Sequence, residues 1–482
     1  MKNSIVKNSL YNMLYNGFNV IFPLISITYL SRVLTAEGIG KVEYARSVAG
    51  YFFAIAALGI PSYGVKLIAQ AGDNIIKRSI AFWELFYLNA VSTFAFSIIY
   101  YVFISYSAYF NGRRTLFYIM GLILLLNFIN IEWYCHGIED YAYVTKRSIF
   151  IKVLSFLLML LFVKKANDYI IYALIICFAA AGNYIFNVLY AAKQIKFICI
   201  SSCRITRHLK PVFILLGSAV AVEVYTMLDT ILIEYFHGEI YVGYYINCVK
   251  IVKLIYTLSI AMVATFYPRI SSYIKKNRSE EINFLLSNGT KVLIIFAFPA
   301  TIGLFLISEA LIPFLFGNSF IPSIDCLKIL SPLVIIFSVS YLLGQIVLMA
   351  SGNESRILIA TLCGTVVNIA LNLLLIPNYK HCGAAAASVI SEILVTTVLL
   401  TKSRKIIEIK IEKTFFISVF LSLVLMFISI QTIRFFIINE LLKLILCVLV
   451  GGSSYFISLV MLRNQIILEF CSKIQNKFYK NE

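Results

Sequence analysis

Charged residues are scarce in this chain. They make up 13% of its 482 residues, whereas hydrophobic residues make up 61% and the mean hydropathy is +0.89. A soluble protein usually carries about 25% charged and about 45–50% apolar residues. The scarcity of charge excludes a soluble enzyme, a nucleic-acid-binding domain and a disordered chain. It leaves a protein that lies in a membrane.

Acidic residues are the scarcer of the two charged classes. The chain has 23 Asp and Glu against 41 Lys and Arg, a net charge of +18. In a soluble protein this excess would suggest a nucleic-acid partner, but here it follows the membrane topology, and we expect no nucleic acid. Most of the Lys and Arg residues fall on alternate loops, which predicts that both termini are cytoplasmic.

Several motifs of catalysis and cofactor binding are missing. The ten cysteines are scattered without a CxxC pair, and the four histidines lie in predicted loops or at span ends, away from one another. This pattern favours small buried cysteines over a disulfide framework or a metal site. The chain has no GxxxxGK[ST] phosphate loop, so ATP is not the direct energy source. We expect no catalytic residue, metal or cofactor.

Long apolar runs recur along the whole chain. A membrane-spanning helix needs about 20 mostly apolar residues. On that basis the sequence predicts an all-α polytopic membrane protein with about fourteen transmembrane helices, the second interrupted by Gly59-Ile60-Pro61. The expected spans are 10–31, 44–65, 80–104, 115–135, 148–163, 169–191, 212–235, 242–267, 290–308, 327–349, 356–376, 383–401, 414–433 and 441–462.

A basic segment divides the expected spans into six before it and eight after it. Residues 192–210 are amphipathic and suited to lying on the anionic inner leaflet, although they could equally form a plain cytoplasmic loop. A faint repeat also indicates two lobes. Glu37, Gly40 and Arg46 around the first two spans resemble Glu239, Gly243 and Lys250 around the seventh and eighth. Secondary transporters are often built from such repeats, with the substrate site between them.

Among the basic residues inside expected spans, three stand out. They are Arg46 in the second span and Lys250 and Lys253, which are three residues apart on one face of the eighth. Ionisable residues within a membrane are costly, so each is a functional candidate. Ion pairs between helices or snorkelling to the headgroups would be structural explanations. Three cations at similar depth are better explained as the lining of a cavity that receives an anion.

Among the acidic residues within expected spans, those of the seventh and twelfth spans stand out. Glu223 and Glu234 are eleven residues apart in the seventh span and share a face, whereas Asp229 points elsewhere. Asp229 and Glu223 are candidates for coupling to an ion gradient. A structural ion pair is the stronger interpretation for Glu234 and for Glu392 in the twelfth span.

Uncharged amides form a stripe along the first span. Asn8, Asn12, Asn16 and Asn19 recur at helical spacing. An amide side chain both donates and accepts hydrogen bonds, which suits sugar hydroxyls. Amides also join transmembrane helices to one another. The four-residue stripe predicts a glycan-contacting surface.

Four segments carry a resemblance to a known family. They are RVLTAEGIGKVEYARSVAGYFFAIAALGIPSYGVKLIA (32–69), WYCHGIEDYAYVTKRSIFIKVLSFLLMLLFV (133–163), VYTMLDTILIEYFHGEIYVGYYINCVKIVK (224–253) and NIALNLLLIPNYKHCGAAAASVISE (368–392). In this order they resemble the Wzx-type bacterial polysaccharide transporters, which are flippases for lipid-linked oligosaccharides. The same superfamily contains multidrug-and-toxin extruders and the lipid II flippase.

The resemblance implies an architecture. It consists of two pseudo-symmetric six-helix lobes (1–191 and 211–401) around a central cavity, joined by the linker 192–210, then two more helices in 402–462 and a cytoplasmic tail, 463–482. By position, Arg46 and Lys250 match cavity cations of the family, and Asp229 matches the acidic position of its seventh helix.

The resemblance also implies a function. The chain would move undecaprenyl-pyrophosphate-linked oligosaccharides from the inner to the outer leaflet of the bacterial cytoplasmic membrane, for O-antigen, capsule or another exopolysaccharide. Membrane lipids, a proton or sodium ion, and a polymerase and chain-length regulator of the same pathway would be its partners. Two alternatives stay open. A cation-coupled drug extruder would favour an acidic cavity, and a membrane-embedded polymerase would show a long external loop or a catalytic cluster.

Overall fold

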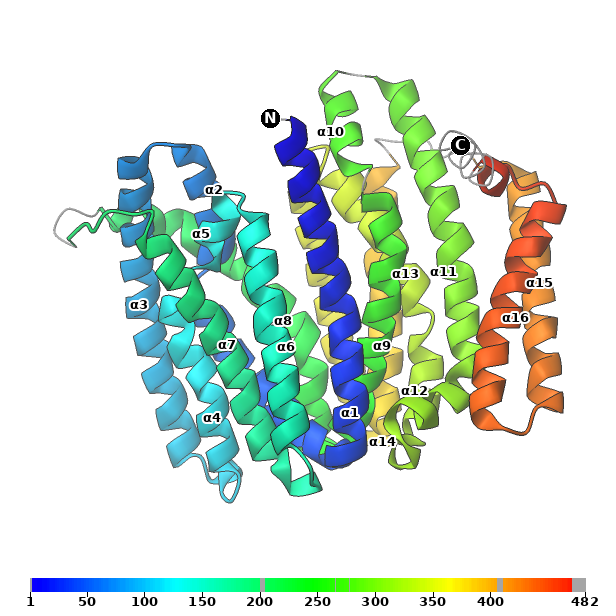
Figure 1. The fold of residues 1–482 in the computed structure, drawn as a ribbon, viewed down its shortest axis with the longest axis horizontal. Coiled ribbons are helices and arrows are strands. Elements are labelled where there is room, and N and C mark those ends of the chain that lie inside the picture. Colours follow the sequence, from blue (N-terminus) through cyan, green and yellow to red (C-terminus); the bar gives the residue numbers. More distant parts are fainter. Residues whose placement is uncertain (1, 200–203, 265, 277, 405–410, 470–482) are drawn as a thin grey trace. The chain divides into compact units, whose positions relative to one another are not determined.

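The computed structural model describes residues 2–199, 204–264, 266–276, 278–404 and 411–469, with side chains from residue 22 onward except at 218, 222, 268, 275 and 279. Every regular element in these ranges is helical (Figure 1). The chain divides into two compact units, Met1–Gly243 and Tyr244–Glu482. The all-helical class expected from the sequence is confirmed.

The first unit contains the helices up to α8 and the first residues of α9. In chain order these are α1 (Lys2–Ala56), α2 (Ile60–Ala71), α3 (Ile75–Tyr106), the short η1 (Ala108–Phe110), α4 (Arg114–Leu125), η2 (Leu126–Ile129), α5 (Glu132–Gly137), α6 (Tyr141–Phe162), η3 (Ala166–Asp168), α7 (Tyr169–Ala192), α8 (Thr206–His237) and α9 (Glu239–Ala264). Side-chain caps fix two of the starts. Asn74 accepts a hydrogen bond from the Lys77 amide before α3, and Asp140 accepts one from the Tyr143 amide before α6.

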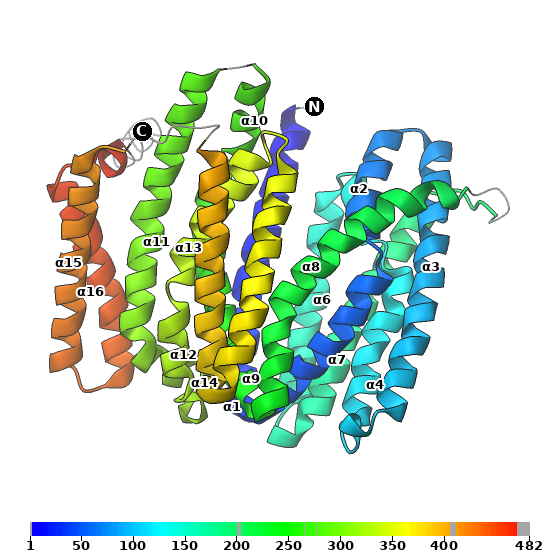
Figure 2. The same ribbon diagram turned by 180° about the vertical axis from the view of Figure 1, so that it is seen from behind.

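Helix α1 reverses direction at one residue. Thr35 has φ 62° and ψ −180°, which breaks the helical backbone and turns the chain back on itself (Figures 1 and 2). The first two expected spans therefore occupy the two arms of α1. A second break at Gly59, where φ is 74°, separates α1 from α2 with a bend of 43°. This bend lies at the Gly59-Ile60-Pro61 interruption seen in the sequence.

The second unit continues α9 and adds the remaining helices. These are α10 (Tyr267–Lys275), α11 (Ser279–Phe316), η5 (Asn318–Phe320), α12 (Ser323–Leu330), α13 (Leu333–Tyr341), the π-helical η6 (Leu342–Leu348), α14 (Glu354–Ser403), α15 (Lys413–Phe436) and α16 (Glu440–Met461). Helix α14 reverses at Lys380, where φ is 55° (Figure 2). Helices α15 and α16 pack against each other.

Candidate membrane-spanning helices can be counted in the structure. Among the described residues, nine helices are long and apolar enough to cross a membrane, or ten if the bent α1–α2 pair is one span. Each of the fourteen expected ranges overlaps a helix, and two pairs of them fall on the arms of α1 and α14. The count of about fourteen and the cytoplasmic termini stay predictions, as do the six-helix lobes.

The segment after α7 is held against α3. Residues 195–199 are not helical, and the Lys196 amide donates to Ser79 Oγ at 2.9 Å while the Trp83 indole donates to the Lys196 carbonyl at 3.0 Å. The Tyr87 hydroxyl donates to the Ile198 carbonyl at 3.1 Å. This part of the expected basic linker is therefore an anchored loop. Residues 200–203 lie outside the described residues.

Candidate functional site

Two helix starts cross at very short range in the first unit. Ala36 follows Thr35 in α1, and Glu239 opens α9 after Gly238, whose φ of 86° and ψ of 174° resemble those of Thr35. A Cβ atom added to Gly40 would lie 1.7 Å from the Glu239 carbonyl oxygen, and one added to Gly243 would lie 2.0 Å from the Ala36 carbonyl oxygen. Each glycine therefore packs directly on the backbone of the other helix, as small residues do in membrane helix pairs.

This contact explains the faint repeat in the sequence. Gly40 lies four residues after Ala36, whose carbonyl oxygen faces Gly243. Gly243 lies four residues after Glu239, whose carbonyl oxygen faces Gly40. The relation is reciprocal, as a local two-fold axis would produce. The glycines matched in the sequence are thus the residues that meet in the structure.

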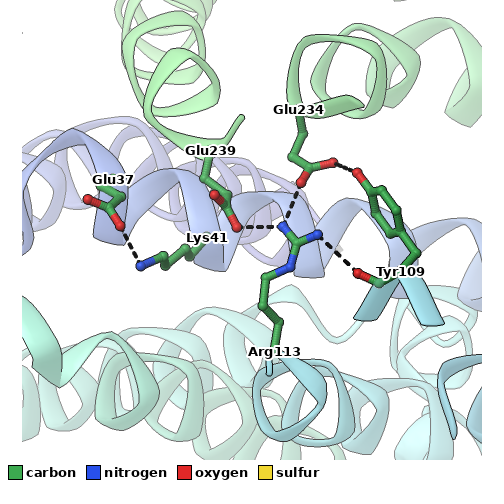
Figure 3. A network of polar contacts seen from close by, with 6 residues as sticks. All are labelled: Glu37, Lys41, Tyr109, Arg113, Glu234 and Glu239. Atoms are coloured by element: carbon green, nitrogen blue, oxygen red, sulfur yellow. Dashed lines mark hydrogen bonds and ion pairs between the residues drawn. The ribbon is translucent and has the colours of Figure 1, made fainter. Parts of the chain in front are cut away.

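An ion-pair network lies beside the crossing (Figure 3). Arg113, the residue before α4, places its Nη1 atom 2.6 Å from Glu234 Oε1 and 2.6 Å from Glu239 Oε1. The Tyr109 hydroxyl donates to the second oxygen of Glu234, and Arg113 Nη2 donates to the Tyr109 carbonyl at 3.3 Å. One guanidinium therefore ties the η1–α4 loop to the end of α8 and the start of α9.

Burial makes this network electrostatically strong. The Glu234 side chain is only 4% exposed, against 28% for Arg113. Burial alone would lower the pKa of the Arg113 guanidinium, but hydrogen bonds to Glu234 and Glu239 outweigh it and raise that pKa above its ordinary value. Burial, and then the bond to Glu234, raise the pKa of the Tyr109 hydroxyl. Both groups therefore keep their protons across the physiological range.

A second ion pair lies on α1 near the crossing (Figure 3). Lys41 Nζ is 2.6 Å from Glu37 Oε1, one helical turn away. The Lys41 ammonium also lies 5.2 Å from the centre of the Tyr169 ring, within the range of a cation–π interaction. Glu37 is more than half exposed, so this pair is a surface interaction of small energy.

An aromatic cavity adjoins the network within the first unit. It measures about 550 Å³ and is lined by α1, α3, η1 and α8, with Tyr44, Tyr51, Tyr109, Tyr235, Phe52 and Phe110 among its walls. Tyr44 packs edge-on against Phe117 of α4 at 5.6 Å between ring centres. The walls of this cavity are mostly apolar.

Arg46 lies in the second arm of α1 with an acidic neighbour. Its Nη2 atom is 2.7 Å from Glu43 Oε2, and the Arg46 side chain is 45% exposed while that of Glu43 is 2% exposed. Glu43 is not among the candidates from the sequence, although it lies only three residues before Arg46. The buried carboxylate orients a guanidinium that keeps nearly half of its surface open.

The other two predicted cations lie in the second unit. Lys250 is partly buried and Lys253 is exposed, three residues apart in the continuous helix α9. Arg46 belongs to the first unit, so the three cations are described in separate units. Their joint action on an anion stays a prediction.

The acidic candidates have different surroundings. In α8, Asp229 is 5% exposed and Glu223 is partly buried. Both are electrostatic neighbours of the Tyr51 side chain of α1, whose hydroxyl donates to the Val224 carbonyl at 3.4 Å. Glu234 forms the ion pair expected of it.

The last candidates are amides and one further carboxylate. Glu392 of α14 accepts a hydrogen bond from Ser340 at 2.9 Å. The side chains of Asn8, Asn12, Asn16 and Asn19 lie outside the described residues, although their backbone is part of α1.

Sequence reasoning did not single out Arg113. Arg113 lies between two expected spans, where charge is ordinary, and its partners Glu234 and Glu239 are 121 and 126 residues away in the chain. Local spacing carries no signal for such a contact. The only hint was that both carboxylates flank another loop predicted on the same side.

Two family models match the chain. The model described as "Polysaccharide biosynthesis protein" matches residues 5–274. The model described as "Lipid II flippase MurJ" matches residues 157–451.

A curated relative and two solved structures are similar to the chain. A proposed O-antigen transporter of Escherichia coli (strain K12) is 24% identical over 83% of this chain and 96% of its own length. The lipid II flippase MurJ in an inward closed conformation aligns with a TM-score of 0.75 at 15% identity, over 96% of this chain and all of its own. An inward-facing MATE-family multidrug transporter of the MOP superfamily aligns with a TM-score of 0.63 at 13% identity, over 80% and 93%.

Proposed function

Because the chain belongs to the family of polysaccharide biosynthesis proteins, we propose that it is a flippase for undecaprenyl-pyrophosphate-linked oligosaccharides. It is a multi-pass membrane protein and a transporter, not an enzyme. The proposed substrate moves from the inner to the outer leaflet of the bacterial cytoplasmic membrane. The observation that carries this proposal is the similarity to an O-antigen transporter over 83% of the chain.

Three cations support a pyrophosphate-bearing substrate. The Arg46 guanidinium has five N–H donors, and its pair with Glu43 leaves part of it open. Arginine binds phosphate oxygens through two parallel hydrogen bonds, and lysine binds them as a point charge. Arg46, Lys250 and Lys253 would hold the pyrophosphate, the asparagine stripe of α1 would contact the glycan, and the polyprenyl tail would stay in the lipid.

The Gly40–Gly243 crossing and the Arg113 network would close one end of the transport path. On the topology predicted by the basic residues, this end faces outward. Alternating access requires a closed end that can open. Opening would separate two helix backbones and break the bonds from Arg113 to Glu234 and Glu239. Substrate binding must supply that energy, alone or with an ion.

An ion gradient would drive the cycle through Asp229 or Glu223. Both carboxylates lie in α8, in which Glu234 joins the Arg113 network. A proton or sodium ion bound there would remove negative charge from the helix. A polymerase and a chain-length regulator would use the exported repeat units.

Deletion of the gene in its host tests the proposal. We expect surface polysaccharide to disappear, lipid-linked repeat units to accumulate, and the wild-type gene to restore both. Arg46→Ala should fail to restore them at a normal membrane level, whereas Lys164→Gln, which removes an exposed positive charge, should succeed. Normal surface polysaccharide in the deletion strain would contradict the proposal. A loss of resistance to cationic drugs instead would favour the extruder.

A further inference from the structure

A charged pocket lies in the second unit, between α11, η5, α12 and the pair α15 and α16. Figure 1 shows the turn from α15 to α16 at the same end of this unit as α12. The pocket measures about 410 Å³, within the range of about 300–1,000 Å³ that is typical of small-molecule sites. Its charged lining consists of Glu309, Arg434, Glu440 and Lys443.

Ion pairs hold these charges in place. The Arg434 guanidinium of α15 pairs with Glu309 Oε2 of α11, and Lys328 of α12 places its Nζ atom 2.6 Å from Glu309 Oε1. Lys443 Nζ lies 2.7 Å from Glu440 Oε1, within the first turn of α16. Glu309 therefore joins three helices, and the pocket wall carries two positive and two negative groups.

Both signs of charge are open to a ligand. Arg434 carries five N–H donors and Lys443 carries three, and one nitrogen atom of Arg434 faces Glu309. The side chains of Glu309 and Glu440 are 49% and 65% exposed. A ligand in the pocket can therefore reach N–H donors and carboxylate oxygens at the same time.

The uncharged runs place the pocket at the depth of lipid headgroups. Residues 414–433 and 444–462 carry no charge, and each run is close to the about 20 residues that cross a hydrocarbon core. Arg434 directly follows the first run, and Lys443 directly precedes the second. Both cations therefore lie at the edge of the hydrocarbon core, where lipid phosphates also lie.

The pocket is polar at this edge and apolar deeper in the membrane. Leu306 lines it one turn before Glu309 in α11, and Cys447 lines it one turn after Lys443 in α16. Helix α11 runs toward the end that carries the turn, whereas α16 runs away from it (Figure 1). Both apolar residues are therefore on the hydrocarbon side of the charged ones. A phospholipid has the same order of groups, with its phosphate above its acyl chains.

The turn beside the pocket is apolar and exposed. Phe435, Phe436 and Ile438 are 83%, 72% and 92% exposed. A group of large exposed apolar side chains marks a surface that contacts another molecule or a membrane. Because Arg434 and Lys443 place this turn at the membrane surface, lipid is the partner that covers it.

We propose that this pocket binds a membrane phospholipid whose headgroup carries a phosphate and a primary ammonium, as in phosphatidylethanolamine. The phosphate accepts hydrogen bonds from Arg434 and Lys443. The ammonium donates to the carboxylates of Glu309 and Glu440. The bound lipid joins the α15–α16 pair to α11.

The balance of charge in the pocket selects among headgroups. Phosphatidylglycerol would satisfy the two cations, but its negative charge would also face Glu309 and Glu440, which disfavours it. Phosphatidylcholine carries both signs of charge, but its trimethylammonium group has no N–H to donate. A primary ammonium has three donors, as the Lys side chain does, and so matches the carboxylates.

Native mass spectrometry of the purified full-length chain tests this site. The chain is stripped of lipid in detergent and mixed with equal amounts of phosphatidylethanolamine, phosphatidylcholine and phosphatidylglycerol with identical acyl chains. We expect phosphatidylethanolamine to be retained about tenfold more than either of the others, the factor that one hydrogen bond between charged groups supplies. Equal retention of the three lipids, or a preference for phosphatidylglycerol, would overturn the proposal.

Two variants separate headgroup recognition from a general loss of lipid. Glu440→Gln removes an acceptor for the ammonium but leaves both cations, so the preference for phosphatidylethanolamine over phosphatidylglycerol should fall about tenfold. Lys443→Gln removes a donor to the phosphate, so the retention of both lipids should fall while their ratio is kept. Both variants should keep the wild-type unfolding temperature, because Glu440 and Lys443 form a surface pair of small energy.

Glu354→Gln is the matched control, since Glu354 is an exposed carboxylate in the first turn of α14 and is not part of the pocket. It should bind all three lipids as the wild type does. An unchanged preference in Glu440→Gln, or the same change in Glu354→Gln, would overturn the proposal.

Glycerophosphoethanolamine distinguishes a membrane lipid from a free headgroup. It has the same phosphate and ammonium but no acyl chains, so at the concentration of the lipid it should not displace bound phosphatidylethanolamine. Displacement at that concentration would show that a soluble molecule suffices and would overturn the assignment to a membrane lipid.

Discussion

Gly40 of α1 and Gly243 of α9 pack reciprocally. A Cβ on either residue would enter the carbonyl group of the opposite helix, at 1.7 Å from the Glu239 oxygen or 2.0 Å from the Ala36 oxygen. Because both obstacles are backbone atoms, no side-chain rotation can relieve the clash. The crossing therefore requires a residue without a side chain on each helix.

Alanine at Gly243 should force α1 and α9 apart. We expect Gly243→Ala and Gly40→Ala each to lower stability by about 1–3 kcal/mol through overpacking, measured by thermal unfolding in detergent, and to reduce surface polysaccharide. Gly217→Ala in α8 is the matched control, since nothing lies within 4 Å of the added Cβ. Equal behaviour of Gly217→Ala and Gly243→Ala would contradict the crossing.

Removal of the Arg113 charge should leave Glu234 buried without its counter-ion. Breaking a buried pair in this way typically costs about 3–5 kcal/mol, so Arg113→Gln should unfold at a clearly lower temperature. The double variant Arg113→Gln with Glu234→Gln should recover part of the loss, because no charge is then stranded. Arg114→Gln removes the same charge one residue away and should have a smaller effect. A similar loss in Arg114→Gln would argue against the network.

The Tyr109 bond should make stability depend on pH only in the alkaline range. The pKa of Tyr109 is raised in the folded protein, so above about pH 10 the unfolded chain loses this proton before the folded chain does. The difference in unfolding temperature between the wild type and Tyr109→Phe should therefore be constant from pH 7 to pH 9 and shrink above about pH 10. A difference in unfolding temperature that grows above about pH 10 would contradict a raised Tyr109 pKa in the folded protein.

Thr35 holds a backbone conformation that suits glycine. At φ 62° and ψ −180° a β-branched residue is strained, by about 1–3 kcal/mol. Thr35→Gly should keep the reversal of α1 and match or exceed the wild-type unfolding temperature. Thr35→Val keeps the branched Cβ and should show no such gain. Loss of folding in Thr35→Gly would contradict the strain.

The cations should act through charge and geometry together. Arg46→Lys keeps the charge but loses the planar guanidinium, so we expect it to restore only part of the surface polysaccharide that Arg46→Ala removes. Lys250→Ala and Lys253→Ala should each reduce export, and the pair more strongly. Wild-type export in the Lys250→Ala, Lys253→Ala double variant would exclude both lysines from substrate binding.

Hydropathy predicted the class of this fold because most apolar runs are about as long as a bilayer core requires. The breaks at Gly59 and Lys380 also lie near interruptions in the apolar pattern. The reversal at Thr35 lies between the first two expected spans, 10–31 and 44–65, so a turn was expected there, but no glycine stands at the residue that adopts the positive φ. Because α1 and α14 each contain two expected spans, counting continuous helices gives fewer spans than counting apolar runs.

The candidate sites were harder to predict for the same reason. Arg46 was found because a cation in an apolar run is conspicuous. Arg113 and Arg434 lie at a helix start and a helix end, where charge is ordinary, and their partners Glu234 and Glu309 are more than 100 residues away. Only the folded chain brings such residues together. The repeat of Gly40 and Gly243 is visible in the sequence, but only the folded chain shows why glycine is needed at both positions.

The most direct test of the account is a leaflet assay with the purified chain in lipid vesicles. The vesicles carry an undecaprenyl-pyrophosphate-linked oligosaccharide in the inner leaflet, and a membrane-impermeant glycosidase added outside reports its arrival in the outer leaflet. With the wild-type chain, cleavage should proceed well beyond that in protein-free vesicles, and Arg46→Ala should abolish the excess. Equal cleavage with and without the wild-type chain would contradict the claim that this protein is a flippase for lipid-linked glycans.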